Sequence, residues 1–331
     1  MMKKTLVGVC TLLCATCNAV HAQTAANFPL KSVRVVVPYP PGGGTDTIGR
    51  PMAQRLAENT RQQFIIDNRG GAGGNIGMEL VAKSPPDGYT LVLAVTAQLA
   101  VNPGLYKKLP YDPLKDFEPV TLLATGPYVL LVHPSLPVKS TKELLALARA
   151  RPGQITYGSA GNGSGAHLAT ELLGSMAGVK MIHIPYKGGG PALVDLLAGN
   201  IQMTFATYLS SKQHIDSGRI RALAVSTTKR LSGVNIPTVA ETGLPGFDAG
   251  VWYAYLAPAG TPRELVMKLN SEIIRASEHA EMKAVYTRAA IEPINSTPEE
   301  LTTFMKAEIA KWRFRRQECP CFCKRVSRSG L

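Results

Sequence analysis

Cysteine is missing from the whole body of the chain. All six cysteines lie near the two ends, at Cys10, Cys14, Cys17, Cys319, Cys321 and Cys323. The residues between them therefore offer no disulfide, no thiolate metal ligand and no cysteine nucleophile. A chain of this length buries its hydrophobic cores without disulfides.

Long apolar runs are also missing. A membrane-spanning helix needs roughly 18 or more apolar residues, and the apolar run at residues 6–15 is too short. This run follows Lys3 and Lys4 and precedes Val20-His21-Ala22, a small-x-small cleavage pattern. The arrangement is typical of a secretory signal peptide. We expect residues 1–22 to be removed after Ala22 and the mature chain to reach the periplasm.

Acidic residues are fewer than basic ones. The chain has 23 Asp and Glu against 36 Lys and Arg, a formal net charge of +13. Residues 1–22 carry +2 of this charge and residues 313–331 carry +5, which leaves +6 for the body. This surplus attracts anions over a Debye length of about 8–10 Å. No basic stripe is interleaved with aromatic residues, so we expect no nucleic-acid partner.

Short β-branched runs alternate with amphipathic stretches along the body. The predicted strands are Val33–Val37, Gln63–Asp67, Leu91–Val95, Val129–Val132, Ile155–Gly158, Met181–Pro185, Ile201–Phe205, Arg221–Val225 and Tyr255–Pro258. The alternation predicts an α/β fold with mainly parallel sheets. Capping boxes at Ser140, Thr261 and Thr297 mark helix starts. Pro51 either delays or kinks a helix that we expect from about Thr45.

The body between the expected signal peptide and the tail, residues 23–312, has 290 residues and exceeds one typical domain. It contains no internal repeat and no low-complexity linker. We therefore expect two lobes between which the chain passes more than once, so that the crossings form a hinge and a cleft.

Two glycine-rich loops each follow a predicted strand and precede a predicted helix. They are Pro38–Asp46 and Tyr157–His167. Unpaired N–H groups at a helix N-terminus bind anions. Neither loop has the Gly-Lys-Ser/Thr of a P-loop or the Gly-x-Ser-x-Gly of a nucleophile elbow. Gly161-x-Gly163-x-x-Ala166 matches a dinucleotide pattern, but no acidic residue lies about twenty positions further on. We expect no cofactor.

Several residues near these loops have two interpretations each. Asp46 either accepts a hydrogen bond from a ligand amine or caps its own helix. His167 is either a capping or packing residue or a ligand contact, and Lys187 is either a ligand cation or a solvated surface residue. The cluster Gly70–Gly77 is either a close-packed turn or a ligand contact. The histidines stand at no metal-ligand spacing, so we expect no metal site.

Seven segments carry a family resemblance along most of the body. They are Val35–Asp46, Asp67–Gly77, Pro86–Thr90, Leu109–Pro113, Tyr157–His167, Pro185–Gly188 and Leu256–Pro262. In this order they resemble the Bug-type (TctC-like) receptors of tripartite tricarboxylate transporters. The resemblance implies a type II periplasmic-binding-protein fold with two lobes and a central cleft. We place lobe 1 at residues 27–124 plus 251–312 and lobe 2 at residues 125–250.

The resemblance also implies a function. Such a receptor captures a small mono- or dicarboxylate in the periplasm, performs no chemistry on it, and delivers it to membrane permease subunits; we expect a monomer. The expected ligand contacts are Tyr39, Gly43, Gly44, Asp46, Thr96, Gln98, Ser159, Asn162, Ser164, His167, Tyr186 and Thr207. The alternative is an exported enzyme acting on small organic acids, for which the sequence shows no recognisable nucleophile–base pair.

The sequence departs from the family in two places. Ala206-Thr207-Tyr208 stands where many relatives carry an Asp, which favours a ligand without an amine. After Trp312 the chain ends in a basic tail, residues 313–331, which contains three cysteines and which we expect to lack regular structure. Our hypothesis is a frameshifted terminus, and the alternative is a metal-binding or redox tail.

Overall fold

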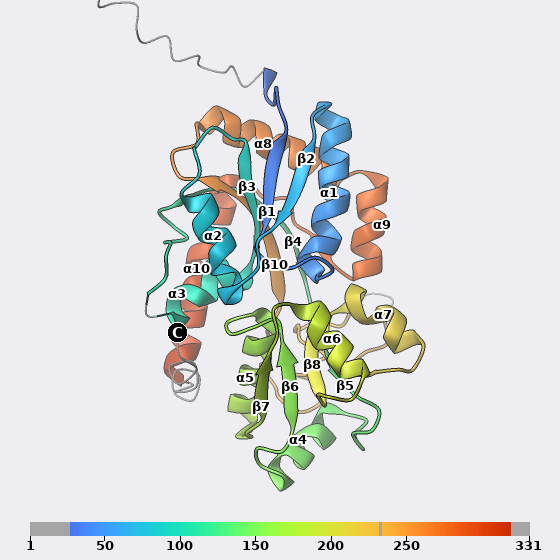
Figure 1. Cartoon of the computed structure of the whole chain (residues 1–331). Helices are drawn as coiled ribbons and strands as arrows, with labels where there is room; N and C mark the ends of the chain where they lie inside the picture. Colours follow the sequence, from blue (N-terminus) through green and yellow to red (C-terminus); the bar gives the residue numbers. More distant parts are fainter. Residues whose placement is uncertain (1–26, 107, 232–233, 319–331) are drawn as a thin grey trace, which may run out of the picture.

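The chain folds into two α/β lobes (Figure 1). The computed structural model describes residues 27–106, 108–231 and 234–318. One sheet has six strands in the order β11-β4-β10-β3-β1-β2, and the other has five in the order β7-β6-β8-β5-β9. The predicted two-lobe α/β fold is confirmed. The predicted signal peptide lies outside the described residues.

The first lobe contains the six-stranded sheet. Its strands are β1 (Val33–Val37), β2 (Phe64–Asn68), β3 (Thr90–Val95), β4 (Phe117–Gly126), β10 (Val251–Pro258) and β11 (Glu292–Pro293). Its helices are α1 (Gly44–Thr60), α2 (Asn75–Ala82), α3 (Asn102–Leu105), α8 (Arg263–Ser277), α9 (Ala280–Ala289) and α10 (Pro298–Glu318), with the short turns η2 (Ala72–Gly74) and η3 (Ala97–Val101).

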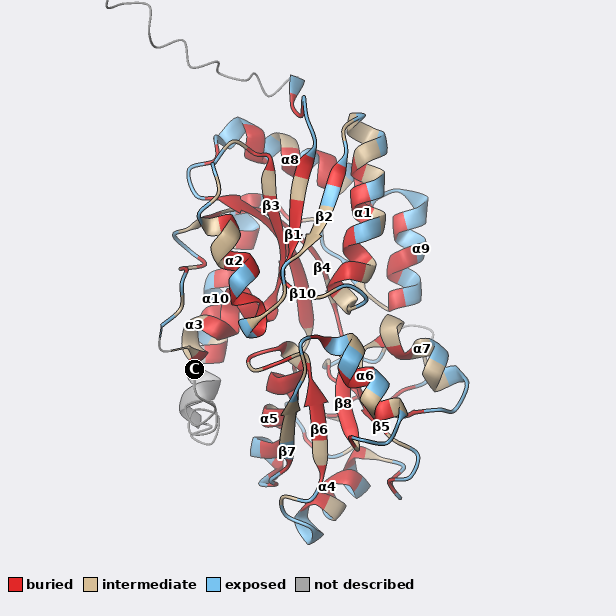
Figure 2. Ribbon diagram, viewed as in Figure 1, coloured by how far each residue is buried: buried red, intermediate tan, exposed pale blue. Residues whose placement is uncertain are grey.

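Both faces of this sheet are covered by helices (Figure 2). Val35 belongs to the core shared with α1, α8 and α9, whereas its neighbour Val36 belongs to the core shared with α2 and α10. Successive side chains of a strand point to opposite faces. A strand covered on both sides reads as a continuous apolar run, which is why β1 is Val-Arg-Val-Val-Val.

The second lobe contains the five-stranded sheet. Its strands are β5 (Tyr128–Val132), β6 (Thr156–Ser159), β7 (Ile182–Pro185), β8 (Met203–Thr207) and β9 (Arg221–Val225). Its helices are α4 (Thr141–Ala150), α5 (Gly165–Ala177), α6 (Gly189–Leu197) and α7 (Tyr208–Asp216). The alternation repeats in β5, because Leu130 packs in the core with α4 and α5 while Leu131 packs with α6 and α7.

Both sheets are mixed, so the prediction of mainly parallel sheets is wrong. β1 is parallel to β2 and β3, and β6 is parallel to β7 and β8. In contrast, β10 and β5 are antiparallel to both of their neighbours. The physical reason is that β5 and β10 are the strands that begin where the chain crosses between lobes (Figure 1). A strand that starts at the cleft runs opposite to strands that end there.

Strand β4 is absent from the predicted strands. It contains Pro119, and a proline within an apolar run argues against a strand. In the structure Pro119 pairs with Leu256 at a register shift between β4 and β10, where a proline is tolerated. β4 ends at Gly126 and β10 starts at Val251, beside the predicted lobe boundaries at 124–125 and 250–251, which stay a prediction.

The helix starts agree with most of the sequence signals. Thr297 and Glu300 exchange both hydrogen bonds of a capping box, which confirms that prediction. Ser140 Oγ accepts the N–H of Glu143 as expected, but the Glu143 carboxylate accepts from Lys139 N–H. The expected box at Thr261 is wrong, because its hydroxyl donates to the carbonyl of Pro258 and no side chain caps α8. α1 begins at Gly44 and includes Pro51. A start delayed to about Arg50 is therefore wrong.

Helix α10 continues past Trp312 to Glu318, so the structure differs there from the expected irregular tail. Residues 313–318 include Arg, Gln and Glu, which favour a helix. The three C-terminal cysteines lie outside the described residues. No helix in the described part of the chain combines the length and apolar character that crossing a bilayer requires.

Candidate ligand-binding site

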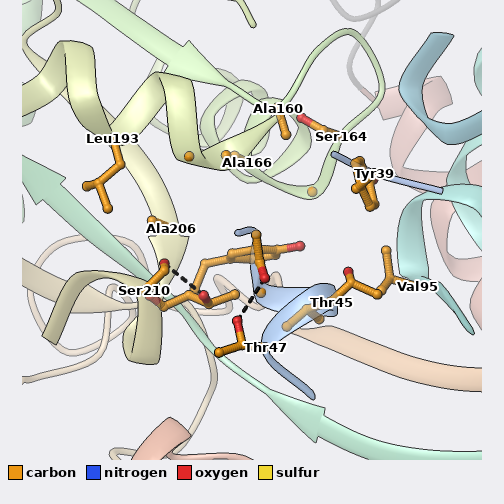
Figure 3. Close-up of a pocket in the computed structure, with 18 of the residues that line it drawn as sticks. Tyr39, Thr45, Thr47, Val95, Ala160, Ser164, Ala166, Leu193, Ala206 and Ser210 are labelled. Atoms are coloured by element: carbon orange, nitrogen blue, oxygen red, sulfur yellow. Dashed lines mark hydrogen bonds between the residues drawn. The ribbon is translucent and has the colours of Figure 1, made fainter. Parts of the chain in front are cut away.

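A cavity of about 210 Å³ lies between the two lobes (Figure 3). The first lobe contributes the loop after β1, the start of α1, Val95, and the beginning of β10. The second lobe contributes the starts of β5, α5, α6 and α7. The carboxyl ends of β1, β6, β7 and β8 lead directly into these helices, which is where α/β folds place ligands.

Four helices begin at this cavity. The residues of their first turns or caps that line it are Gly43, Gly44 and Thr45 of α1, Ser164, Gly165 and Ala166 of α5, Gly189 and Gly190 of α6, and Thr207 and Ser210 of α7. No side chain caps the starts of α1, α6 and α7, all of which lie within the described residues. Uncapped N–H donors and the positive ends of the helix dipoles thus converge on one space, which favours an anion.

The cavity wall is uncharged. Among the residues that the structure describes, no Lys, Arg, Asp or Glu lines it. Much of the remaining wall is apolar, including Val95, Leu193, Phe205, Ala206 and Val251. A ligand ammonium group would find no carboxylate here, and burying an unpaired charge is costly. The site suits a guest with an anionic end and an uncharged, largely apolar remainder.

Asp46 holds the loop between β1 and α1. Its carboxylate accepts hydrogen bonds from Gly42 N–H (3.2 Å), Arg50 Nε (2.8 Å) and Asn68 Nδ2 (3.0 Å). Burial acts to raise the pKa of Asp46, but these hydrogen bonds outweigh it and keep the pKa below its ordinary value. Gly42 has φ +85°, a conformation that a glycine adopts without strain. Asp46 therefore fixes the loop before α1 without capping the helix itself, and it does not line the inner cavity.

Gln98 and Thr96 lie buried behind the wall. Gln98 Nε2 donates hydrogen bonds to Tyr39 Oη and to the carbonyl of Gly73, both at 2.8 Å. Thr96 Oγ1 accepts a hydrogen bond from the N–H of Trp252 (3.0 Å). Gln98 thus fixes a tyrosine that faces the cavity, and Thr96 fixes the start of β10.

Buried side chains that do not line the cavity support the loop between β6 and α5. Ser164 lines the cavity and caps α5 by accepting the N–H of His167 (3.4 Å). His167 Nδ1 accepts the N–H of Gly163 (3.1 Å), and its ring stacks on His183 with centroids 4.1 Å apart. Ser159 Oγ shares a hydrogen bond with His183 Nε2 (2.6 Å). His167 and Ser159 therefore shape the loop, which matches the packing interpretation of His167.

A second, outer cavity of about 330 Å³ shares Tyr39 and Ala160 with the inner one. Its other lining residues are Gly71, Ala72, Gly73, Gly74, Tyr106, Gly161, Asn162, Tyr186 and Lys187. The cluster Gly70–Gly77 thus forms part of a wall. Tyr106 Oη donates toward the carbonyl of Asn162 (3.1 Å), which joins the two lobes at this cavity. Tyr186 Oη donates to Asp195 within its own lobe (2.5 Å).

The twelve predicted contacts therefore fall into three groups. Those on the inner wall are Tyr39, Gly43, Gly44, Ser164 and Thr207, those on the outer wall are Asn162 and Tyr186, and those behind the walls are Asp46, Thr96, Gln98, Ser159 and His167. Their part in binding stays a prediction. The inner cavity is also lined by Tyr128, Leu193, Ser210 and Tyr253, which were not among the predicted contacts. The one sequence signal for Tyr128 and Tyr253 is their position near the start of a strand that follows a crossing between the lobes.

The sequence comparison identifies a family. Residues 48–318 match the profile described as "Tripartite tricarboxylate transporter family receptor". The chain is 38% identical, over 94% of its length and 92% of the relative's, to the "UPF0065 protein in tcbD-tcbE intergenic region" of Pseudomonas sp. (strain P51). It is 37% identical to protein BugT of Bordetella pertussis, over 93% of this chain and 95% of that protein.

Solved structures agree with the sequence match. R. palustris Rpa4515 with adipate is 39% identical, with a TM-score of 0.85 over 88% of this chain and 98% of that one. The periplasmic binding protein BugD is 31% identical, with a TM-score of 0.85 over 88% and 99% of the two chains. MatC from Rhodopseudomonas palustris with bound malate is 32% identical, with a TM-score of 0.83 over 86% and 99%. This chain therefore belongs to the Bug-type receptor family of tripartite tricarboxylate transporters, as its loops predict.

Proposed function

We propose that this protein is a periplasmic receptor that captures a small mono- or dicarboxylate and passes it, unchanged, to the membrane subunits of a tripartite tricarboxylate-type transporter. One observation carries the proposal: α1 of one lobe and α5, α6 and α7 of the other all begin at one uncharged cavity. Adipate and malate in two related structures support a carboxylate as the guest.

The ligand class follows from the composition of the wall. Ala206 and its apolar neighbours offer no counter-ion for an amine, so we propose that the ligand carries no ammonium group. Four sheltered helix starts at about 1 kcal/mol each fall short of the roughly 8 kcal/mol that micromolar binding requires. Hydrogen bonds from hydroxyl groups on the wall and the exclusion of water by lobe closure supply the rest.

Export and hinge placement belong to the same proposal. Lys3, Lys4, the apolar run and Val20-His21-Ala22 support cleavage after Ala22 and a periplasmic mature chain. We place the hinge at the two crossings, at Pro127 between β4 and β5 and just before β10. Closure about this hinge would present one joint surface of both lobes to the permease.

The rival function is an exported enzyme. Ser159 and His183 form a hydrogen-bonded pair of the kind that a hydrolase uses. However, Ser159 is fully buried and lies outside the inner wall, so a guest in the cavity would not reach its hydroxyl. A ligand incubated with the protein and recovered for mass spectrometry should be chemically unchanged; conversion with turnover would favour the enzyme.

A thermal-shift panel tests the proposal itself. The panel contains adipate, malate, hexanoate, glutamate and adipamide. We expect at least one amine-free carboxylate to raise the unfolding temperature and the neutral diamide adipamide to leave it unchanged. Only an anion is stabilised electrostatically by the helix N-termini. No shift with any carboxylate, or a shift with glutamate alone, would contradict the proposal.

A further inference from the structure

Three tyrosines from three separate segments meet at the inner cavity. Tyr39 lies in the loop after β1, Tyr128 is the first residue of β5, and Tyr253 lies near the start of β10. Tyr128 and Tyr253 therefore follow the two crossings between lobes. Both side chains line the cavity next to the segments at which we place the hinge.

The hydroxyl groups of Tyr128 and Tyr253 are unused by the protein. Neither has a hydrogen-bond partner in the described part of the chain, although Tyr253 is only 1% exposed and lines the cavity. Tyr255 Oη is among the buried oxygens without a partner but these two are not, so both hydroxyls are accessible from the cavity. By comparison, Tyr39 Oη already accepts the hydrogen bond from Gln98.

All three phenols are proton donors at neutral pH. Burial raises the pKa of Tyr39 to about 12 and raises the pKa values of Tyr128 and Tyr253 as well. Each therefore keeps its proton and offers it to an acceptor. The side chain of Tyr128 also packs against Gly165, leaving no room for a Cβ there, so its hydroxyl lies at the first turn of α5. The Tyr128 hydroxyl and the N-terminal turn of α5 therefore lie together at the inner cavity.

We propose that the hydroxyl groups of Tyr128 and Tyr253 donate hydrogen bonds to a carboxylate oxygen of the ligand and are specificity-determining contacts of this receptor. The inference rests on the proposed function, because it assigns the donors of the same cavity. It explains how an anion is held where the wall has no Arg or Lys among the described residues. A carboxylate accepts several such bonds, whereas an ammonium group or a methyl end accepts none.

The test uses Tyr128→Phe, Tyr253→Phe and the double variant. The matched control is Tyr255→Phe. Tyr255 lies on the same strand as Tyr253 and its hydroxyl likewise has no partner among the described residues, but that hydroxyl is sealed in the core and does not line the cavity. Isothermal titration calorimetry with adipate, malate and hexanoate gives the affinities. Unfolding temperatures without ligand show that each variant folds, since loss of an unpaired hydroxyl should leave them unchanged or raised.

We expect each cavity variant to bind roughly tenfold or more weakly and the control to match wild type. A double variant within twofold of wild type overturns this inference and leaves the proposed function standing. A wild-type protein that binds none of the three carboxylates overturns the proposed function, and this inference with it.

Discussion

Gly44 of the first lobe packs directly against Thr207 of the second. A Cβ on Gly44 would lie 2.5 Å from Thr207 Cγ2, closer than carbon atoms approach. Both residues line the inner cavity, at the starts of α1 and α7. The backbone of Gly44 is not left-handed, so the glycine is needed for the contact between lobes and not for its own conformation.

Gly44→Ala should therefore hinder lobe closure without harming the fold. We expect carboxylate affinity to fall roughly tenfold, about 1.4 kcal/mol, and the unfolding temperature without ligand to stay the same or rise slightly, since Ala favours a helix. Calorimetric titration and thermal unfolding measure the two effects. The comparison variant is Gly44→Ala combined with Thr207→Ser, which removes the methyl carbon closest to the new Cβ and should restore affinity. Equal affinities for both variants would count against the closure contact.

Asp46→Asn should reveal a pH-dependent contribution to stability. The folded pKa of Asp46 lies below its ordinary value because hydrogen bonds from Arg50, Asn68 and Gly42 outweigh the effect of burial. Its charge thus stabilises the fold above the unfolded pKa of about 3.9, and that contribution is lost as pH falls through the folded pKa. We expect wild type to be more stable than the variant by about 1–2 kcal/mol at pH 7.

Urea unfolding at pH 7 and pH 3 checks this expectation for Asp46. The difference between wild type and variant should shrink at the lower pH. A difference that is the same at both values would mean that the charge of Asp46 is unimportant and that the loop depends on shape alone.

Gln98→Leu should destabilise the wall from behind. The change leaves the buried N–H of Val95 without its acceptor and the carbonyl of Gly73 without its main donor. Each buried group that loses its partner costs about 1–3 kcal/mol, so we expect the free energy of unfolding to fall by about 2 kcal/mol or more. Gln54→Leu, an exposed change on α1, is the control and should cost under about 0.5 kcal/mol. If both variants lost a similarly small amount of unfolding free energy, the proposed support of the wall by Gln98 would be refuted.

Ala206→Asp should reverse the charge preference of the cavity. A carboxylate at this position would repel a bound dicarboxylate strongly in a sheltered site and would offer a counter-ion to an amine. We expect adipate binding to weaken roughly tenfold or more and glutamate binding to appear or strengthen. Ala206→Asn separates size from charge, because it should weaken adipate less and gain no glutamate. Unchanged selectivity in the Asp variant would show that residue 206 does not face the ligand.

The elements that local sequence decides were predicted well. β1 and β9 were predicted at the bounds that the structure gives them, and the glycine loops before α1 and α5 stand at the cavity. Thr297 and Glu300 form the expected reciprocal cap. In each case the signal lies within a few consecutive residues: a β-branched run, a glycine cluster after it, or a capping pair.

The features that were missed depend on contacts between distant segments. β4 was not predicted because Pro119 argues against a strand. The register shift between β4 and β10, which accommodates this proline, is a tertiary feature. The direction of β5 and β10 follows from where the chain crosses between lobes, and no local pattern records that. Tyr128 and Tyr253 stand 125 positions apart and meet only through these crossings. Asp46 and Gln98 were predicted at the site, but whether each faces the cavity or supports it depends on partners elsewhere.

Carboxylate binding by converging helix starts, without a charged side chain on the wall, is the central claim about this receptor. Paired calorimetric titrations of wild-type protein with adipate and with its neutral analogue adipamide test this claim most directly. We predict measurable adipate binding that weakens as pH falls below the ligand's own pKa, and at least a hundredfold weaker binding of adipamide, about 2.7 kcal/mol. Equal affinity for the two compounds would show that the cavity recognises shape and not charge, and would contradict the account.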